Sequence, residues 1–500
     1  MNMTTVLQPV RLSFVHKSAV PFPSIPPFVR WQISPILFNC QQQARCAHFR
    51  RNVSYTAAEV EGIEKPAAFR APNMPRRASP LSILPLSNLI RSYLITAVSS
   101  SPLLLRTSLG ALKFLAHSKS PMLNPDRNPI LHFLLKRTIY AQFCAGETAN
   151  EVDQTINKLK RMGYKGILLG YAREVCLDGN QAQNMECTVS REDLDANTIL
   201  SWARGTISTV KLAQPGDFVA LKFTGAGTQA LQHLVEAKPP PPLLAKSITE
   251  ICDLAMTRNV RLLFDAEQDA VQAGIDAWTI SYMKQYNRKE KALVYGTYQA
   301  YKKSTPGVLA NHLALAHKNT FVLGVKLVRG AYLGSDPRHL FWDTIEDTHK
   351  AYDGIAESLM RRTYNDVLKP TSPGAKTFPS INVILAGHNK DSIAKAQEIR
   401  NSQARSNEPR VSLVYAQLMG MAENISCGLI VAGQLAKEDG RERMFDIPKA
   451  YQYLVWGTVS ECSQYLVRRA EENKDALSRT KEGRKALGKE LLRRLGISAE

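Results

Sequence analysis

The segment Leu323-Gly-Val-Lys-Leu-Val328 has the composition of a buried β-strand, because apolar and β-branched residues fill it almost without interruption. Seven more short runs of this kind occur at residues 166–170, 218–222, 260–264, 292–295, 381–385, 411–415 and 451–455. The segments between them are long enough for a helix, so neighbouring strands are expected to be parallel, with right-handed crossovers. Eight such units predict an α/β fold, a closed (β/α)8 barrel of the TIM type.

The competing arrangement is an open, doubly wound sheet. It is disfavoured because no Gly-x-Gly-x-x-Gly motif follows the first predicted strand. In a barrel of parallel strands, binding and catalytic groups lie at the C-terminal ends of the strands. Candidate functional residues are therefore expected just after the eight runs.

The N-terminal segment has no acidic residue before Glu59, but it has basic residues at Arg11, Lys17, Arg30, Arg45, Arg50 and Arg51. An acid-free, Arg-bearing start with scattered Ser and apolar residues is typical of a mitochondrial transit peptide. The segment lacks the continuous apolar block of a secretory signal. Residues 1–55 are therefore predicted to be a mitochondrial transit peptide with a disordered linker.

Residues 56–145 are predicted to form a linker and an N-terminal helical region. Pro, Ala and Arg are frequent in residues 59–80, and residues 81–118 fit two amphipathic helices. No uncharged run there reaches the ~20 residues of a membrane-spanning helix. The two helices could cover a core or lie in a membrane interface. A further helical segment, residues 129–145, leads into the barrel.

The barrel domain is predicted to cover residues 146–480, and residues 481–500 are predicted to be a basic helical tail. The formal net charge of +20 could indicate nucleic acid or an anionic membrane surface. Part of this excess lies in the leader, so a membrane surface and no nucleic-acid partner are expected. The eight Cys residues are dispersed and form no Cys-x-x-Cys pair, which disfavours a zinc site and a disulfide framework.

Polar side chains stand at the C-terminal end of nearly every predicted strand. They are Lys222, Asp265, Gln299, Lys326, Arg329, His388, Asn389, Gln417 and Tyr453. In a barrel these groups would surround one cavity, although Asp265 could equally be an ordinary helix N-cap. His388 has no second His at ligand spacing, and no activated Ser or Cys nucleophile stands with a paired base. This set indicates a bound cofactor that carries the chemistry, with no metal.

The segment Tyr465-Leu-Val-Arg-Arg-Ala-Glu-Glu-Asn473 is predicted to be a helix. Tyr465, Arg468, Arg469 and Glu472 would then share one face, because they stand at positions i, i+3, i+4 and i+7. Two adjacent guanidinium groups suit a substrate carboxylate, since Arg presents a fixed fork of donors. The alternative is a solvated helix face with ordinary Arg–Glu pairs.

Five motifs follow one another along the chain: Phe264-Asp-Ala-Glu-Gln268, Thr297-Tyr-Gln299, Lys326-Leu-Val-Arg-Gly-Ala-Tyr332, Gly387-His-Asn389 and the Tyr465–Asn473 helix. In combination they resemble the proline dehydrogenase (proline oxidase) family over roughly residues 130–480. The leader and the N-terminal helical region resemble its fungal-type, eukaryotic mitochondrial members. The resemblance implies a distorted barrel that binds FAD noncovalently and oxidises L-proline to Δ1-pyrroline-5-carboxylate, the first step of proline catabolism. It also implies electron transfer to ubiquinone on the matrix side of the inner mitochondrial membrane.

The resemblance also implies roles for individual residues. Arg468 and Arg469 would hold the substrate carboxylate, aided by Lys222, while Tyr453 and Tyr465 would pack against the proline ring. Asp265 would belong to both the reacting centre and the cofactor site. The residues expected around the flavin are Asp265, Ala266, Gln299, Lys326, Arg329, Gly330, Ala331, Tyr332, His388, Asn389, Gln417, Met419, Arg469 and Glu472.

Two departures from the family pattern concern the shape of the pocket. The family usually has Tyr-x-Pro-x-Gly where this chain has Tyr453-Leu-Val-Trp-Gly457, and Met419 stands where Leu is usual. A hydroxyproline oxidase and another flavin-dependent barrel enzyme, such as a folate reductase, therefore stay open as alternatives. Tyr453 disfavours the former, because a hydroxylated ring needs more room and polarity. A non-enzymatic, membrane-associated protein is the third alternative, and the complete set of polar strand ends argues against it.

Overall fold

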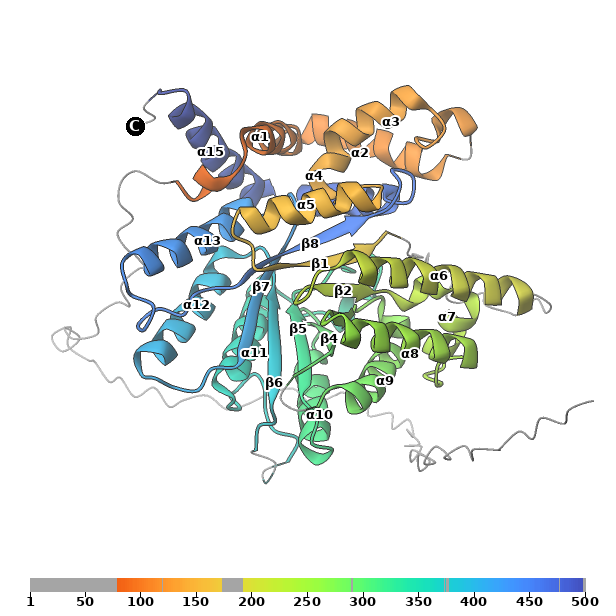
Figure 1. The fold of residues 1–500 in the computed structure, drawn as a ribbon, viewed down its shortest axis with the longest axis vertical. Helices are drawn as coiled ribbons and strands as arrows, with labels where there is room; N and C mark the ends of the chain where they lie inside the picture. The colour runs from red at the N-terminus through yellow and green to blue at the C-terminus, as the bar shows by residue number, and fades with distance from the viewer. Residues whose placement is uncertain are drawn as a thin grey trace, which may run out of the picture. The chain divides into compact units, whose positions relative to one another are not determined.

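Eight parallel strands close into a barrel in sequence order, with β8 hydrogen-bonded to β1, so the predicted (β/α)8 fold is confirmed (Figure 1). The computed structural model describes residues 79–497 apart from 119, 173–191, 289–290, 373, 375–376 and 476; the predicted transit peptide lies outside these residues. The strands are β1 (Gly166–Tyr171), β2 (Phe218–Leu221), β3 (Arg261–Phe264), β4 (Val294–Gln299), β5 (Leu323–Val328), β6 (Ile381–Ala386), β7 (Ser412–Leu418) and β8 (Ala450–Trp456).

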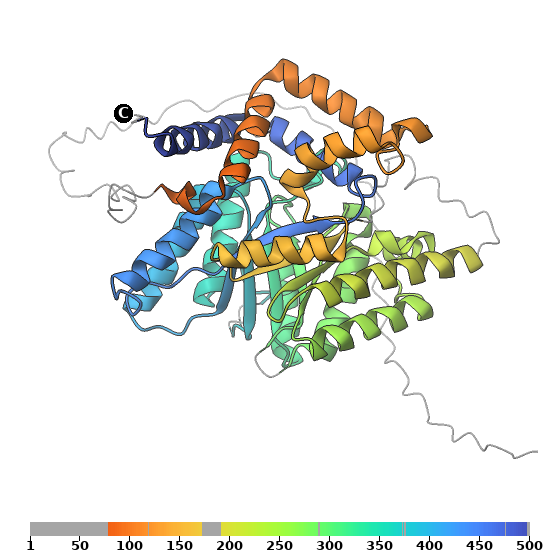
Figure 2. The same ribbon diagram turned by 45° about the horizontal axis from the view of Figure 1, so that its top comes forward.

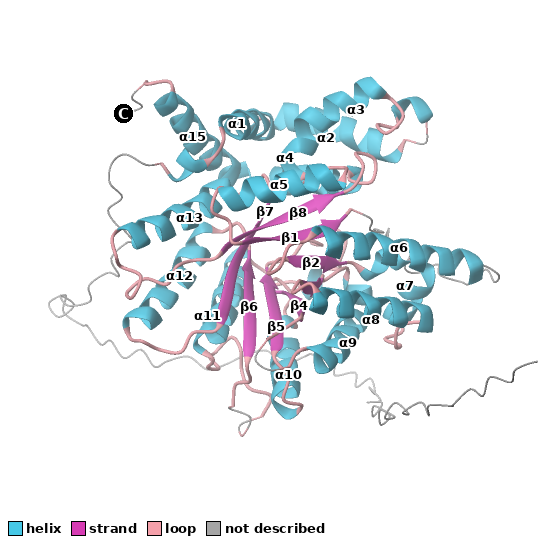
Figure 3. Cartoon of the chain, viewed as in Figure 1, coloured by secondary structure: helices cyan, strands magenta, loops and turns pink. Residues whose placement is uncertain are grey.

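Helices surround the strands on the outside of the barrel (Figure 3). They are α5 (Ala149–Arg161), α6 (Glu192–Leu212), α7 (Thr228–Val235), α8 (Pro242–Thr257), α9 (Asp269–Tyr286), α10 (Thr305–Lys318), α11 (Ile345–Arg361), α12 (Lys390–Arg405) and α13 (Glu423–Glu438), followed by α14 (Ser463–Asp475) and α15 (Leu477–Arg494). Short 3-10 turns, η4 (Phe223–Ala226) and η5 (Arg338–Leu340), follow β2 and β5.

Local sequence explains where several of these helices begin. Thr148 and Thr344 precede α5 and α11, and their hydroxyls accept hydrogen bonds from backbone N–H groups in the first turn. The side-chain oxygen of Asn389 accepts from the N–H of Ser392 at 3.0 Å and caps α12 in the same way. Such caps satisfy backbone donors that have no partner within the helix.

The fourth strand starts later and runs further than the predicted range 292–295. The apolar pair Ala292-Leu293 belongs to the approach to the strand, where the side-chain oxygen of Asn287 accepts from the N–H groups of Leu293 and Val294 at 2.9 and 2.8 Å. The strand continues to Gln299 through residues that the apolar pattern does not include. Polar side chains in its second half point to partners in the barrel, as described below.

Aromatic side chains fill the N-terminal end of the barrel interior. The ring centroid of Phe218 lies 5.2 Å from that of Tyr295 and 5.7 Å from that of Tyr451, both edge to face. The guanidinium carbon of Arg261 lies 3.7 Å from the centroid of the Phe218 ring. Gly166 leaves room for this packing, because a Cβ atom there would lie 2.3 Å from the Tyr451 ring. Access to the interior is therefore left to the C-terminal end of the strands, here called the barrel mouth.

The N-terminal region is helical, as predicted. Residues 81–118 form α1 (Leu86–Ser100) and α2 (Pro102–His117), preceded by a 3-10 turn, η1 (Pro80–Ile83). The segment that leads into the barrel comprises η2 (Pro121–Leu123), α3 (Pro129–Leu135), a π-helical turn, η3 (Lys136–Tyr140), and α4 (Ala141–Phe143). Among the described helices, none combines the length and the hydropathy needed to span a bilayer.

Helix α15 begins at Leu477, before the start predicted for the basic tail, and it packs against α1. Arg494 donates from Nη2 to the carbonyl oxygens of Leu81, Ser82 and Leu84 at 3.1, 3.1 and 2.7 Å. The carboxylate of Glu490 accepts hydrogen bonds from Arg493 and Arg494, and these lower its pKa to about 2. The C-terminal helix is therefore joined to the N-terminal helices by a charged, partly buried cluster.

Candidate active site

The barrel mouth brings the predicted strand-end residues to one end of the fold. Lys222 and Asp265 directly follow β2 and β3, Gln299 ends β4, and Lys326 lies within β5. Because the strands are parallel and adjacent in sequence order, their C-terminal ends meet at the same rim. Asp265, Gln299 and Lys326 are each less than a tenth exposed, so these polar groups belong to the interior of the barrel.

Asp265, Lys326 and Tyr453 form one buried cluster. Lys326 Nζ lies 2.5 Å from Asp265 Oδ1, and the hydroxyl of Tyr453 donates to Asp265 Oδ2 at 3.0 Å. Lys326 Nζ also lies 5.2 Å from the centroid of the Tyr453 ring. Helix α9 begins only at Asp269 and its N-cap is Gln268, so Asp265 is not a helix N-cap. Two side chains, from β5 and β8, thus converge on the carboxylate that directly follows β3.

The electrostatics of the cluster keep Asp265 ionised. Burial alone would raise the pKa of Asp265, but the charges of Lys326 and Lys222 and the hydrogen bonds from Lys326 and Tyr453 hold that pKa below its usual value. Burial and the neighbouring carboxylate raise the pKa of the Tyr453 hydroxyl well above its usual value. At neutral pH Asp265 is therefore a carboxylate and Tyr453 is a neutral phenol.

Two residues that received no predicted role complete this part of the barrel mouth. The hydroxyl of Thr297 lies 3.5 Å from Asp265 Oδ1, and the buried Glu267 accepts hydrogen bonds from the backbone N–H and the hydroxyl of Thr224. Gln299 donates from Nε2 to the carbonyl oxygen of Glu267 at 3.2 Å. Thr297 could have been found from the sequence, because it stands two residues before Gln299 and so on the same face of the strand.

Arg329 is held at the end of β5 by groups from α11, the helix after that strand, and from α12. It donates from Nε to His349 Nδ1 at 3.2 Å and from Nη2 to the Ser392 hydroxyl at 2.8 Å, and its guanidinium carbon lies 4.3 Å from the Tyr352 ring centroid. The buried Lys302 pairs with Asp269 at 2.8 Å and with Asp336 at 3.2 Å. These contacts fix both ends of the loop at residues 329–336.

The turn after Arg329 depends on glycine. Gly330 has φ +148°, and a Cβ atom there would lie 2.1 Å from the ring of Tyr301. The hydroxyl of Tyr301 accepts from the N–H of Tyr332 at 3.2 Å. Gly330 and Ala331 are exposed, so this turn presents its backbone at the surface.

We expect Gly330→Ala to lower the free energy of unfolding by about 1–3 kcal/mol. Alanine disfavours the φ of this position, and its methyl group would displace the Tyr301 ring. Thermal unfolding measures the loss. Gly334→Ala is the matched control, since a Cβ atom there meets nothing within 4 Å. Equal stability of the two variants would contradict the role given to Gly330.

Side chains at the ends of β6 and β7 form hydrogen bonds within the protein. His388 accepts from the N–H of Leu418 at its Nε2 atom, at 3.1 Å. Gln417 accepts from the Ser426 hydroxyl at 2.9 Å and donates to the carbonyl oxygen of Gly387 at 3.4 Å. Met419 is half-buried. Asn389, expected near a cofactor, uses its side-chain oxygen to cap α12.

Helix α14 carries Tyr465, Arg468 and Arg469. Arg469 is 4% exposed and Tyr465 is also 4% exposed, and the guanidinium carbon of Arg469 lies 4.8 Å from the Tyr465 ring centroid. Arg468 is half-buried. A solvated helix face is therefore wrong for Arg469. Tyr465 belongs to the same buried cluster as Tyr453, which brings α14 against the barrel mouth. Glu472 lies in α14, but its side chain is outside the described residues.

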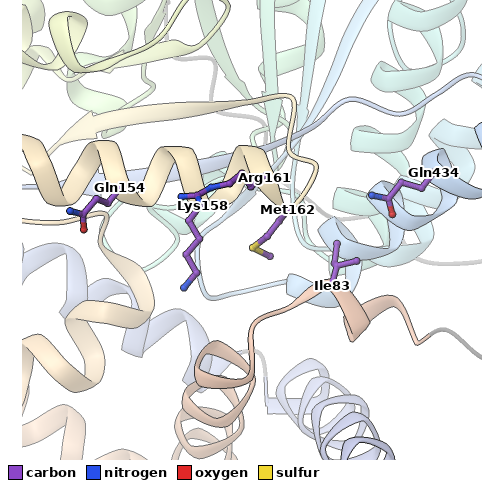
Figure 4. Close-up of a pocket in the computed structure, with 6 residues that line it drawn as sticks. All are labelled: Ile83, Gln154, Lys158, Arg161, Met162 and Gln434. Carbon is purple, nitrogen blue, oxygen red and sulfur yellow. The ribbon is translucent and has the colours of Figure 1, made fainter.

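A surface cavity of about 700 Å³ lies away from these residues (Figure 4). It is lined by Ile83, Gln154, Lys158, Arg161, Met162 and Gln434. Helix α5, the residue that follows it and α13 contribute all of this lining except Ile83, and both helices lead to the N-terminal ends of strands. This cavity is therefore separate from the candidate active site.

The comparisons with known proteins agree with this geometry. The sequence model of the family described as "Proline dehydrogenase" matches residues 152–482. The probable mitochondrial proline dehydrogenase of Schizosaccharomyces pombe is 28% identical over 456 residues, which cover 82% of this chain and 89% of that protein. The hydroxyproline dehydrogenase of Mus musculus is 26% identical over 401 residues, which cover 72% of this chain and 83% of that protein.

A solved structure supports the fold. The proline utilization A protein of Bdellovibrio bacteriovorus, inactivated by N-propargylglycine, aligns with a TM-score of 0.54 and 16% identity. The alignment covers 80% of this chain and 40% of that longer one. Since the family match spans well over half of the residues and includes the barrel with all its strand-end groups, the chain belongs to the proline dehydrogenase family.

Proposed function

We propose that this chain is a mitochondrial, FAD-dependent enzyme that oxidises L-proline to Δ1-pyrroline-5-carboxylate. The observation that carries the proposal is the buried Asp265–Lys326–Tyr453 cluster at the mouth of a barrel of this family, next to the helix that bears Arg468 and Arg469. A substrate with one carboxylate and a small apolar ring suits these groups, because arginines match the carboxylate and tyrosine rings match the apolar part.

Residues of the barrel mouth fit a flavin in two respects. Lys326 is a buried cation, which suits a cofactor that takes on negative charge when it is reduced. The turn at Gly330 and Ala331 is exposed directly after Arg329, which suits close approach of a ligand to the main chain. The residues proposed to hold FAD are those expected above: Asp265, Ala266, Gln299, Lys326, Arg329, Gly330, Ala331, Tyr332, His388, Asn389, Gln417, Met419, Arg469 and Glu472.

Bound FAD would supply the acceptor for the hydride that leaves the carbon next to the ring nitrogen. Arg468 and Arg469, aided by Lys222, would hold the carboxylate, and Tyr453 and Tyr465 would orient the ring. The reaction also releases the proton of the amine. Asp265 already accepts hydrogen bonds from Lys326 and Tyr453, so we assign that proton to solvent rather than to this carboxylate.

A dye-reduction assay tests the proposal directly. The purified full-length chain, supplied with FAD, is mixed with L-proline and an artificial electron acceptor, and the reduction of the dye is measured. We expect turnover with L-proline and much less with 4-hydroxy-L-proline. A folded, flavin-loaded protein that reduces no dye with L-proline would contradict the proposal, and preference for hydroxyproline would favour the second candidate function, hydroxyproline oxidation, which the mouse relative supports.

Tyr453 is expected to set the choice between the two substrates. Tyr453→Ser should weaken the preference for L-proline over 4-hydroxy-L-proline by about 1–3 kcal/mol, because it removes an apolar ring and leaves room for a hydroxyl. Tyr453→Phe is the control, since it keeps the ring and removes only the hydrogen bond to Asp265. An unchanged ratio of kcat/KM for the two substrates in Tyr453→Ser would show that this side chain does not contact the ring.

We also propose that the electrons pass to ubiquinone and that the enzyme lies on the matrix side of the inner mitochondrial membrane. The acid-free leader supports import, and the family's mitochondrial members support the compartment. A quinone is soluble in the bilayer, so an enzyme that uses it needs contact with the membrane surface. The N-terminal helices are the part of the chain with the composition for such contact.

A further inference from the structure

The described residues expose large apolar side chains mainly in one region. Eleven of the twenty large apolar side chains that are exposed lie within residues 86–134, on α1, α2, α3 and the turn between α2 and α3. Figures 1 and 2 both show these three helices beside one another at the same end of the molecule. This group of side chains is called the N-terminal apolar surface below.

Helix α1 shows that the exposure is organised. Leu86, Ile90, Leu94 and Val98 recur every four residues and are 52%, 44%, 58% and 38% exposed. Four-residue spacing places them on one face of the helix. Leu89 belongs to the other face, is fully buried and packs in a cluster with side chains of α15. One face of α1 therefore packs against the protein, and the other is an exposed apolar stripe.

The next two helices extend this surface. Leu103 and Phe114 on α2 are 73% and 64% exposed, and Ile130 and Phe133 on α3 are 73% and 57% exposed. Exposed apolar side chains of this size are thus concentrated on three neighbouring helices, and such a concentration often marks a binding surface.

The charges of this region indicate which kind of partner the N-terminal apolar surface binds. Residues 80–145 contain seven Lys or Arg residues, at positions 91, 106, 113, 119, 127, 136 and 137, and one acidic residue, Asp126. Arg106, Arg127 and Arg137 are exposed, and no carboxylate of the described residues forms an ion pair with them. Exposed apolar side chains and exposed arginines in one region match the acyl boundary and the phosphates of an anionic lipid surface.

We propose that the N-terminal apolar surface docks on an anionic phospholipid bilayer, with its apolar side chains at the headgroup–acyl boundary and its arginines at the lipid phosphates. This deepens the proposed membrane location, on which it rests, by naming the surface. A second copy of the chain is a poorer partner, because two such basic surfaces would repel each other. The chain's own leader is also basic, so it does not complement this surface either.

The docked surface would lie next to the substrate-binding helix. Helix α2 packs against α14, and Lys113 Nζ lies 2.6 Å from the carboxylate of Glu471, three residues after Arg468. Docking through α1–α3 would therefore bring the helix of the arginine pair near the membrane surface. A bilayer-soluble electron acceptor would then need to travel only a short way to the barrel mouth.

The test is vesicle flotation of the full-length protein, with phosphatidylcholine vesicles that contain or lack phosphatidylglycerol. We expect binding to the anionic vesicles, and omission of the anionic lipid should weaken it about fivefold for each arginine at the membrane surface. Leu94→Ser and Phe114→Ser should each weaken binding about tenfold. Met256→Ser and Met444→Ser are matched controls, since those side chains are 57% and 61% exposed on other elements, against 58% and 64% for Leu94 and Phe114.

Dye-linked proline oxidation of the same proteins separates this inference from the proposed function. We expect all four variants to keep the wild-type rate with the soluble dye. A wild-type protein that oxidises proline but binds neither kind of vesicle would overturn the docking surface and leave the function standing. Equal vesicle binding by the Leu94 and Met256 variants would overturn it as well. Loss of a dimer, rather than of vesicle binding, in Leu94→Ser would assign the surface to a second copy of the chain.

Discussion

Replacing Arg468 by Met should lower kcat/KM for L-proline by about 30- to 1000-fold, which corresponds to about 2–4 kcal/mol for one charge-assisted contact in a partly dehydrated site. Flavin content should change little, because Arg468 is assigned to the substrate and is only half-buried. The expected effect is large because Arg468 would supply one of the two guanidinium groups that hold the only carboxylate of the substrate. Steady-state kinetics with a soluble dye measure the change.

Two further variants sharpen this experiment. Arg468→Lys should recover little activity, since Lys keeps the charge but loses the planar fork of donors. Arg361→Met is the control. Arg361 forms an exposed i,i+4 ion pair with Glu357 at 2.9 Å, which is the kind of pair that the solvated-face alternative assigns to Arg468. Such a pair contributes no more than about 0.5 kcal/mol and has no effect on kinetics. If Arg468→Met behaved like Arg361→Met, with flavin retained, Arg468 would not contact the carboxylate.

Replacing Lys326 by Met should have the second large effect, on stability and on flavin retention together. The side chains of Lys326 and Asp265 are only 8% and 7% exposed. Removing one partner of such a pair leaves a buried charge without its counterion, which typically lowers the free energy of unfolding by about 3–5 kcal/mol. Denaturant unfolding and the flavin content of the purified variant measure the two effects.

The pH dependence of stability shows whether Asp265 causes the loss of stability in Lys326→Met. In the wild type the pKa of Asp265 lies below its usual value of ~3.9, so the stability from this pair is present above that value and is lost as the pH falls through the folded-state pKa. In Lys326→Met, burial would instead dominate and raise the pKa of Asp265. The variant should therefore regain stability relative to the wild type when the pH is lowered from about 7 to about 5.

Arg400→Met is the control for this second experiment. Arg400 is also buried, at 7% side-chain exposure, and pairs with Asp446 at 3.0 Å. It donates to the carbonyl oxygen of Val411, just before β7, and so lies at the opposite end of the barrel from the mouth. It should lose stability but keep its flavin and its kcat. Equal flavin retention by the Lys326 and Arg400 variants would contradict the placement of Lys326 at the cofactor.

The fold could be predicted because each buried parallel strand is a continuous apolar run, and eight such runs with helix-length separations leave few arrangements. The fourth strand shows where this signal fails. Its second half consists of polar and aromatic residues whose hydrogen-bond partners lie on the turn after β3 and on α10, so local composition marks only its beginning. Asn287, which prepares the strand by accepting from two backbone N–H groups, gives no signal in an apolar pattern.

The residues of the candidate site could be predicted, but the hydrogen bonds between them could not. The strand-end rule selects Asp265, Lys326 and Tyr453 separately, yet nothing in a single sequence shows that two of them donate to the third. The same limit applies to Asn389, which matches a motif but caps α12 with its side-chain oxygen. For the N-terminal helices, the sequence left a core and a membrane interface equally open. Helix α1 buries one face in a core cluster and exposes the other, and the exposed face is the one proposed for the membrane interface.

The central claim is that this barrel binds FAD and uses it to oxidise L-proline, and anaerobic reduction of the bound flavin tests it most directly. The purified, flavin-loaded protein is mixed with L-proline in the absence of oxygen and of any dye, and the visible absorbance of the flavin is followed. We expect L-proline to bleach the flavin of the wild type fully. The flavin of Arg468→Met should bleach much more slowly at the same L-proline concentration. A protein that carries flavin but keeps its full absorbance at saturating L-proline would contradict the account.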